Sequence, residues 1–210
     1  MPLILASTSP RRHELLALLR IPFDIRCPSV EERLVAGRLA TQQVMSFAQG
    51  KAQSVARHEP QAIVLGSDTV IELDQHVIGK PTDLTEARAM LRHLAGRDHR
   101  VRTAVALVCS ARAIEMVALS TAVVLMKSFD ERVHERYLGT RESLGKAGAY
   151  SIQGEGGDLV DSIDGDFTAV VGLPLRLVSQ LLLQAGVNVP VDLDELYAIK
   201  PYTNWARFSV

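Results

Sequence analysis

The two longest apolar runs of the chain follow each other with only a short polar connector between them. Residues 101–109 and 114–126 each have the length and composition of a strand, and Ser110, Ala111 and Arg112 separate them. So short a connection joins antiparallel neighbours, because parallel strands need a crossover of a dozen or more residues. The pair therefore predicts a hairpin, and a sheet that contains it is not wound in parallel throughout.

Elsewhere, strand-length apolar runs alternate with segments of helical periodicity. Further strands are predicted at 3–6, 23–27, 62–66, 70–73, 77–78, 159–163 and 167–171. Helices are predicted from Pro10, over 39–58, between Asp83 and Gly96, from 128 or 130 to 138, and over 175–185. This alternation, together with the hairpin, implies an α/β fold with a mixed sheet flanked by helices.

The composition narrows the class of protein. The 23 Lys and Arg residues nearly balance the 24 Asp and Glu residues, so no general basic surface for nucleic acid is expected. No apolar run is long enough to span a membrane, and nothing before the first strand resembles a signal peptide. Cys27 and Cys109 form no CxxC pattern. These observations favour a soluble cytoplasmic protein with reduced thiols and no membrane partner.

The first strand leads directly into a candidate anion site. Ser7, Thr8 and Ser9 form a polar turn, Pro10 suits the first position of a helix, and the cations Arg11 and Arg12 follow. Backbone N–H groups at a helix N-terminus favour phosphate, whereas cations are better placed at the other end. A bound phosphate would remove this conflict. The alternative is a solvated helix start whose arginines pair with acids elsewhere.

A second candidate is Asp68, which lies between two apolar runs in the stretch Ser67-Asp68-Thr69. The pattern predicts a strand that ends near residue 66, a polar turn, and a second strand from 70. An acid at the end of a strand lies where α/β sheets bind ligands. The alternative is a structural Asx turn between the two strands.

Other polar groups are weak signals taken singly. Glu31 and Glu32 lie in a predicted loop, Lys51 in an amphipathic helix and Lys80 in a turn, where such side chains are normally solvated. The glycine-rich stretch 145–157 permits close backbone approach to a ligand. It is neither a Walker A loop nor a GxGxxG fingerprint, so P-loop and dinucleotide-binding proteins are excluded.

Taken together and in order, these segments form a specific set: LILASTSPRRHELL at 3–16, VEE at 30–32, KA at 51–52, GSDTV at 66–70, GKP at 79–81, AGAYSIQG at 147–154 and VVGLPL at 170–175. The set resembles the Maf family of nucleotide pyrophosphatases, which are related in fold to inosine-triphosphate pyrophosphatases. The resemblance implies a domain over residues 1–187, with two lobes around a central cleft. The tail, residues 188–210, has no counterpart in the family pattern and no expected role.

The resemblance also implies an activity. Members hydrolyse a nucleoside triphosphate between the α- and β-phosphates, which yields a monophosphate and pyrophosphate and removes non-standard nucleotides. A divalent cation, Mg²⁺ or Mn²⁺, a cytoplasmic location and a homodimer are expected. Two alternatives stay open: a 7-methyl-GTP pyrophosphatase of the same family, and a non-catalytic nucleotide sensor that regulates septum formation.

Site roles follow from the same resemblance. Asp68 is expected to be the general base or a metal ligand, with Glu32 as a further metal ligand. Phosphate binding is expected of Ser7, Arg12, Lys51 and Lys80. Arg11, Thr69 and Gln153 mark the branch that acts on dTTP and UTP. A primary amide such as that of Gln153 can donate to one carbonyl of uracil or thymine and accept from its N–H.

Overall fold

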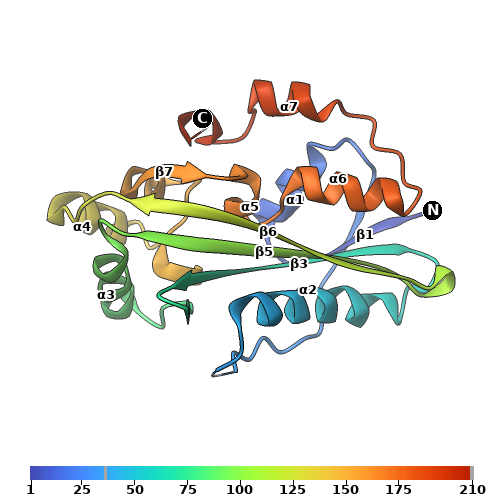
Figure 1. The fold of residues 1–210 in the computed structure, drawn as a ribbon, viewed down its shortest axis with the longest axis horizontal. Helices are drawn as coiled ribbons and strands as arrows, with labels where there is room; N and C mark the ends of the chain where they lie inside the picture. The colour runs from blue at the N-terminus through green and yellow to red at the C-terminus, as the bar shows by residue number, and fades with distance from the viewer. Residues whose placement is uncertain (36, 209–210) are drawn as a thin grey trace.

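The computed structural model describes residues 1–35 and 37–208. A seven-stranded mixed sheet forms its centre, in the order β2-β1-β3-β5-β6-β7, with β4 paired to β3 (Figure 1). The strands are β1 (Leu3–Ala6), β2 (Asp24–Arg26), β3 (Ile63–Leu73), β4 (His76–Ile78), β5 (Asp98–Cys109), β6 (Ile114–Met126) and β7 (Val160–Asp164).

The predicted hairpin and mixed sheet are confirmed. β5 and β6 pair antiparallel from Asp98↔Leu125 to Cys109↔Ile114, and a short 3-10 turn, η1 (Ser110–Arg112), joins them. β1 lies parallel to both β2 and β3, whereas β3–β5, β3–β4 and β6–β7 are antiparallel. β1 ends opposite the middle of β3, where Ala6 pairs with Gly66.

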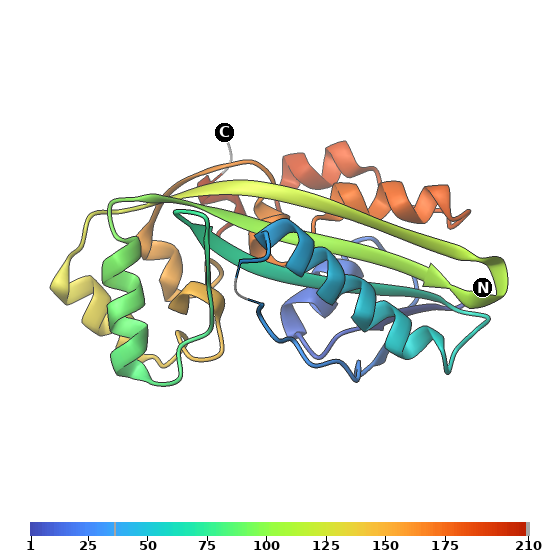
Figure 2. The ribbon, with the colours of Figure 1, turned by 60° about the horizontal axis from the view of Figure 1, so that its bottom comes forward.

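Helices cover both faces of the sheet. α2 packs on one face, and α1, α5 and α6 lie on the other (Figure 1). α3 and α4 pack together at the far end of the long strands and form a second group (Figure 2). The molecule therefore has two lobes along one sheet. The helices are α1 (Pro10–Ala17), α2 (Ala40–Ala56), α3 (Leu84–Leu94), α4 (Glu131–Gly139), α5 (Phe167–Val171), α6 (Leu175–Gln184) and α7 (Leu193–Ile199).

Asp68 does not lie in a turn at a strand end, and that prediction is wrong. β3 runs without interruption through Ser67, Asp68 and Thr69, because its register with β5 is continuous from Val64↔Val108 to Glu72↔Arg100. A long strand that carries polar residues in its middle resembles two short strands when only its sequence is considered. Asp68 belongs to a central strand, just beyond the point where β1 ends.

Residues 167–171 are not a strand either. They form the short helix α5, because the carboxylate of Asp166 accepts a hydrogen bond from the backbone N–H of Thr168 at 2.8 Å and caps its first turn. The apolar run of strand length gave no indication of this cap.

The tail folds onto the domain. It forms α7 and a 3-10 turn, η4 (Trp205–Phe208), and both Trp205 and Phe208 are buried. The predicted loop 28–38 and the tail include residues 36 and 209–210, which lie outside the described part of the chain. Within the described part, every helix is too short or too polar to cross a lipid bilayer.

Candidate active site

One cavity of about 770 Å³ opens in front of the middle of β3. Its walls come from the β1–α1 turn, the loop before α2, α2 itself, β3 and the segment 145–154. All nine side chains that the sequence singled out line it: Ser7, Arg11, Arg12, Glu32, Lys51, Asp68, Thr69, Lys80 and Gln153. The fold thus brings together residues that are up to 146 positions apart in the sequence, from Ser7 to Gln153.

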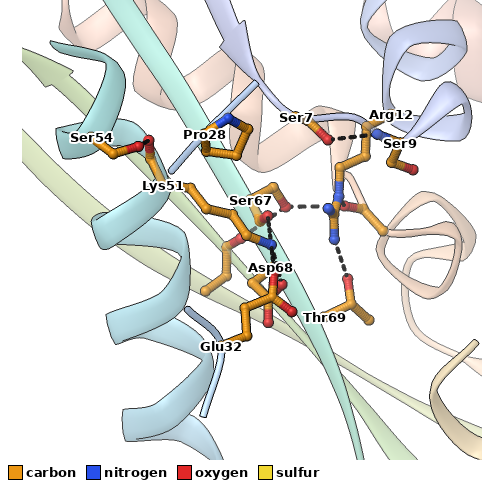
Figure 3. Close-up of polar contacts among 12 residues, drawn as sticks. Ser7, Ser9, Arg12, Pro28, Glu32, Lys51, Ser54, Ser67, Asp68 and Thr69 are labelled. Carbon is orange, nitrogen blue, oxygen red and sulfur yellow. Dashed lines mark hydrogen bonds and ion pairs between the residues drawn. The ribbon is translucent and has the colours of Figure 1, made fainter. Parts of the chain in front are cut away.

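An ion-pair cluster forms the base of the cavity, and two of its three members, Lys51 and Asp68, are buried (Figure 3). Lys51 reaches from α2 toward β3, and its Nζ lies 2.6 Å from Asp68 Oδ1 and 2.5 Å from Glu32 Oε1. Asp68 and Lys51 are only 5% and 7% exposed. Because buried charges are tolerated only when they are paired, each side chain of this cluster fixes the position of the others.

Gly66 determines how closely α2 approaches the cluster. A Cβ at this position would lie 2.3 Å from the Ala48 carbonyl oxygen and 2.7 Å from the Ala52 backbone nitrogen, both on α2. A glycine in a strand interior often marks such a close backbone contact. Because Gly66 has no side chain, α2 packs directly against β3. Lys51, which follows Ala48 by about one turn of α2, therefore reaches Asp68.

Glu32 connects the buried cluster to the mouth of the cavity. Its second oxygen lies 3.5 Å from Lys80 Nζ, and the Lys80 side chain is 60% exposed. Burial by itself would raise the pKa of Glu32, but the ammonium groups of Lys51 and Lys80 outweigh it and hold that pKa below its usual range. Glu32 is therefore ionised at neutral pH.

Arg12 is held against the opposite wall. Its Nε donates to the Gly172 carbonyl at 2.9 Å and its Nη2 to Thr69 Oγ1 at 3.3 Å. Thr69 Oγ1 lies 2.9 Å from Thr103 Oγ1, which itself donates to the Ala169 carbonyl at 2.7 Å. Thr69 must therefore donate to Thr103 and accept from Arg12. Burial lowers the pKa of Arg12, and the nearby carboxylates of Asp68 and Glu32 oppose this effect.

The β1–α1 turn supplies the wall next to Arg12. Ser7 is buried, and its Oγ accepts from the backbone N–H of Ser9 at 3.1 Å. Ser9 is the N-cap of α1 and its side chain makes no capping hydrogen bond. The predicted strand–turn–helix element thus lies at the cavity, while Arg12 turns away from the helix terminus toward Gly172 and Thr69 (Figure 3).

The other end of the cavity is lined by Arg11, Gln153 and Tyr150. Arg11 Nη1 donates to Ser151 Oγ at 3.2 Å. Tyr150 is buried, and its hydroxyl lies 2.8 Å from Nε2 of the buried His99. Burial lowers the pKa of His99 to about 4, so this ring is neutral at pH 7.

The family described as "Maf-like protein" matches residues 2–185, which is most of the chain. The chain belongs to the Maf family. A curated relative from Symbiobacterium thermophilum, named dTTP/UTP pyrophosphatase, is 45% identical to this chain over 89% of this chain and 95% of the relative. One in Pelotomaculum thermopropionicum is 42% identical, over 89% of this chain and 98% of the relative.

A solved structure, that of the Staphylococcus aureus Ham1 protein, is a distant likeness of this Maf-family chain. It is 13% identical with a TM-score of 0.45, and the match covers 60% of this chain and 72% of that one.

Three contributors to the Maf site were not predicted from the sequence. Ser67 Oγ lies 2.9 Å from the Ala104 carbonyl and 3.0 Å from the Gly172 carbonyl, so it ties β5 and the 172 turn to β3. Glu14 lines the cavity one helical turn after Arg11, and this i, i+3 spacing was the available signal. Tyr202 comes from the tail, and no local pattern in the sequence points to it.

The carboxylates of the cavity are possible ligands of a divalent cation. Within the described residues, no group of three acidic, histidine or cysteine side chains forms a complete metal site. Two carboxylates, those of Glu32 and Asp68, nevertheless converge on a single positive charge, the ammonium of Lys51. Mg²⁺ is typically bound by one or two carboxylates together with water and substrate phosphates, so these residues fit such an ion.

Proposed function

We propose that this protein hydrolyses dTTP, UTP and modified pyrimidine nucleoside triphosphates to the monophosphate and pyrophosphate, and so removes non-standard nucleotides. The observation that carries the proposal is the buried Asp68–Lys51 pair, joined by the partly exposed Glu32, at the base of a cation-lined cavity. Membership of the Maf family and the names of the relatives support the same activity.

The reaction is an attack of water on the α-phosphorus. Asp68 accepts the proton of that water, the bond from the α-phosphorus to the oxygen that bridges to the β-phosphate breaks, and pyrophosphate leaves. Lys51 and Glu32 hold Asp68 in one orientation. Because the ammonium of Lys51 already contacts Glu32, Asp68 and, at 3.5 Å, the Ser67 carbonyl, it binds phosphate only by exchanging one of these partners.

The cations of the cavity bind the triphosphate. Arg12 has further N–H groups besides those given to Gly172 and Thr69, and the exposed ammonium of Lys80 lies at the mouth of the cavity. Together with Lys51 they neutralise the charge that develops on the pyrophosphate leaving group, and Ser7 binds a phosphate oxygen through its hydroxyl. Glu32 and Asp68 would hold Mg²⁺ or Mn²⁺. Such an ion would lower the pKa of bound water and stabilise the negative charge of the phosphates.

The base is recognised at the opposite end of the cavity. Arg11, Thr69 and Gln153 distinguish dTTP and UTP from 7-methyl-GTP in this proposal. Thr69 acts indirectly, through its hydrogen bond to Arg12 among the phosphate-binding groups, whereas Arg11 and Gln153 face the cavity from α1 and the glycine-rich segment.

The deciding experiment measures pyrophosphate release from dTTP, UTP, CTP, GTP, 7-methyl-GTP and 5-methyl-UTP, with and without Mg²⁺. We expect the highest kcat/KM with dTTP and UTP and dependence on the metal. A preference for 7-methyl-GTP would overturn the assignment of the pyrimidine branch. Binding of nucleotides without any pyrophosphate release would instead favour a nucleotide-sensing regulator.

The proposal includes the setting of the enzyme. Residues 1–187 form the hydrolase domain, and the protein acts as a cytoplasmic homodimer without a nucleic-acid or membrane partner. The near balance of 23 basic and 24 acidic residues supports the absence of a nucleic-acid partner. Light scattering of the full chain tests the dimer, for which the expected mass is twice 22.9 kDa.

A further inference from the structure

A side chain of the tail, Tyr202, contacts residues that line the cavity. The family match ends at residue 185, so Tyr202 lies outside it. The Tyr202 hydroxyl nevertheless donates to Glu14 Oε2 at 2.6 Å and accepts a hydrogen bond from Gln153 Nε2. Glu14 and Gln153 line the cavity, whereas Tyr202 does not. A residue of the tail therefore touches the side chain that is expected to read the base.

This part of the tail is firmly attached to the glycine-rich segment. Asn204 Nδ2 lies within 2.8, 3.1 and 3.2 Å of the carbonyl oxygens of Ile152, Gln153 and Gly154. A Cβ on Gly157 would lie 2.7 Å from the same Asn204 nitrogen, so a glycine is needed for this fit. Next to it, Trp205 stacks on Phe167 with ring centroids 5.7 Å apart. The tail thus holds the segment that carries Gln153 in place through hydrogen bonds.

The hydrogen-bond chain has a fixed direction. An ionised carboxylate only accepts hydrogen bonds, so the Tyr202 hydroxyl must donate its proton to Glu14. The Tyr202 oxygen can then only accept, and its partner on Gln153 must be the NH₂ group. Burial and the carboxylate of Glu14 both raise the pKa of Tyr202, so the hydroxyl keeps its proton at neutral pH.

We propose that Tyr202 is a positioning residue that locks the Gln153 amide in one orientation and thereby selects uracil and thymine over cytosine. The inference rests on the proposed nucleotide hydrolysis and deepens it. With its NH₂ group directed to Tyr202, Gln153 presents to the cavity an acceptor, Oε1, and one remaining N–H donor. Uracil and thymine offer the matching N–H and carbonyl on adjacent ring positions.

Cytosine carries the opposite pattern at those positions. Its ring N3 is an acceptor and its exocyclic amine is a donor, so it pairs well only with an amide turned by 180°. A free glutamine could turn at little cost and would accept both bases. A glutamine that is locked leaves cytosine N3 facing an acceptor, and such a mismatch typically costs ~10- to 100-fold in affinity.

The test compares UTP with CTP, which differ only at this edge of the base. In Tyr202→Phe the aromatic ring stays and the hydroxyl is lost, so the Gln153 amide is free to turn. We expect the ratio of kcat/KM for UTP over CTP to fall about 10-fold. Glu14→Gln should lower the same ratio, because a neutral amide can donate as well as accept and no longer fixes the direction of the chain.

Tyr197→Phe is the matched control. It removes one hydroxyl from the same tail, where that hydroxyl contacts Asp166 and Thr168 far from Gln153 in the hydrogen-bond network. We expect it to change stability and to leave the UTP/CTP ratio unchanged. Should Tyr202→Phe fail to fold, Glu14→Gln gives the answer alone, since Glu14 is an exposed residue of α1 and the tail remains intact.

Calorimetric Kd values for UTP and CTP, measured without divalent metal, separate the two proposals. A wild-type protein that releases no pyrophosphate overturns the proposed function, and the ratio of the two Kd values still decides the role of Tyr202. If wild type prefers UTP but both variants keep its ratio, or lose activity toward both nucleotides equally, Tyr202 is structural and the inference is wrong.

Discussion

The two ends of the cavity are built in different ways. The end that is proposed to bind the phosphates, called the phosphate end, contains Asp68 from the centre of β3 and Lys51 from α2. Both side chains are nearly inaccessible to solvent. The end that is proposed to bind the nucleobase, called the base end, contains Gln153 from an irregular glycine-rich segment that is hydrogen-bonded to the tail. The groups proposed to carry out the chemistry are thus fixed by the core, whereas those proposed to choose the substrate lie on peripheral segments.

The largest effect is expected at the phosphate end, with Asp68→Asn. The amide keeps the shape of the side chain and can still accept from Lys51, but it is a poor base. We expect kcat to fall about 10³-fold while the metal-free Kd for UTP changes little. Steady-state kinetics and calorimetry check this, with Asp161→Asn, an exposed acid of β7, as the control. A near-normal kcat would place the base elsewhere.

The two adjacent arginines should separate the two ends. Arg12→Ala removes a half-buried guanidinium from the phosphate end, and we expect kcat/KM to fall about 10²-fold for every nucleotide. Arg11→Ala acts at the base end and should mainly change the ranking of dTTP, UTP and CTP. The full nucleotide panel on both variants is the measurement. Equal losses with an unchanged ranking in both variants would refute the division.

Lowering the pH should decrease the free energy of unfolding through His99, whose ring contacts Tyr150 in the wall of the cavity. The folded protein keeps this ring neutral, with a pKa of about 4, whereas the unfolded chain binds a proton below about 6.5. The contribution to stability is therefore complete above pH 6.5 and is lost as the pH falls from 6.5 toward 4, by about 3 kcal/mol. Urea unfolding at several pH values checks this. His99→Gln should be less stable at pH 7 but should lose less stability over that interval; equal pH slopes would contradict the prediction.

The smallest effect concerns the close contact that positions Lys51. In Gly66→Ala the new methyl group meets the α2 backbone, so we expect the free energy of unfolding to drop by about 1–2 kcal/mol and kcat to fall with it. Gly139→Ala at the end of α4 is the control, because a Cβ there meets nothing within 4 Å. Thermal unfolding of the two variants gives the comparison. A Gly66→Ala protein as stable as the control would show that α2 shifts freely.

Much of the site could be predicted because it is encoded locally. Each candidate residue lies in a short segment with its own signature, such as the turn before Pro10 or the GSDTV stretch around Asp68, and the cavity gathers all nine of them. The local backbone was harder to predict. Asp68 lies inside a strand because pairing with β5 outweighs its polar neighbours, and α5 is a helix because Asp166 caps it.

The sequence by itself determined the mixed α/β sheet, the family and nine of the side chains around the cavity, because hydrophobic periodicity and short motifs are properties of neighbouring residues. Only the tertiary structure decided which of these side chains touch. It paired Lys51 with Glu32 and Asp68, turned Arg12 toward Gly172, and brought Tyr202 to Gln153. Such contacts join residues tens of positions apart, and they depend on how closely packed elements approach, which no local pattern records.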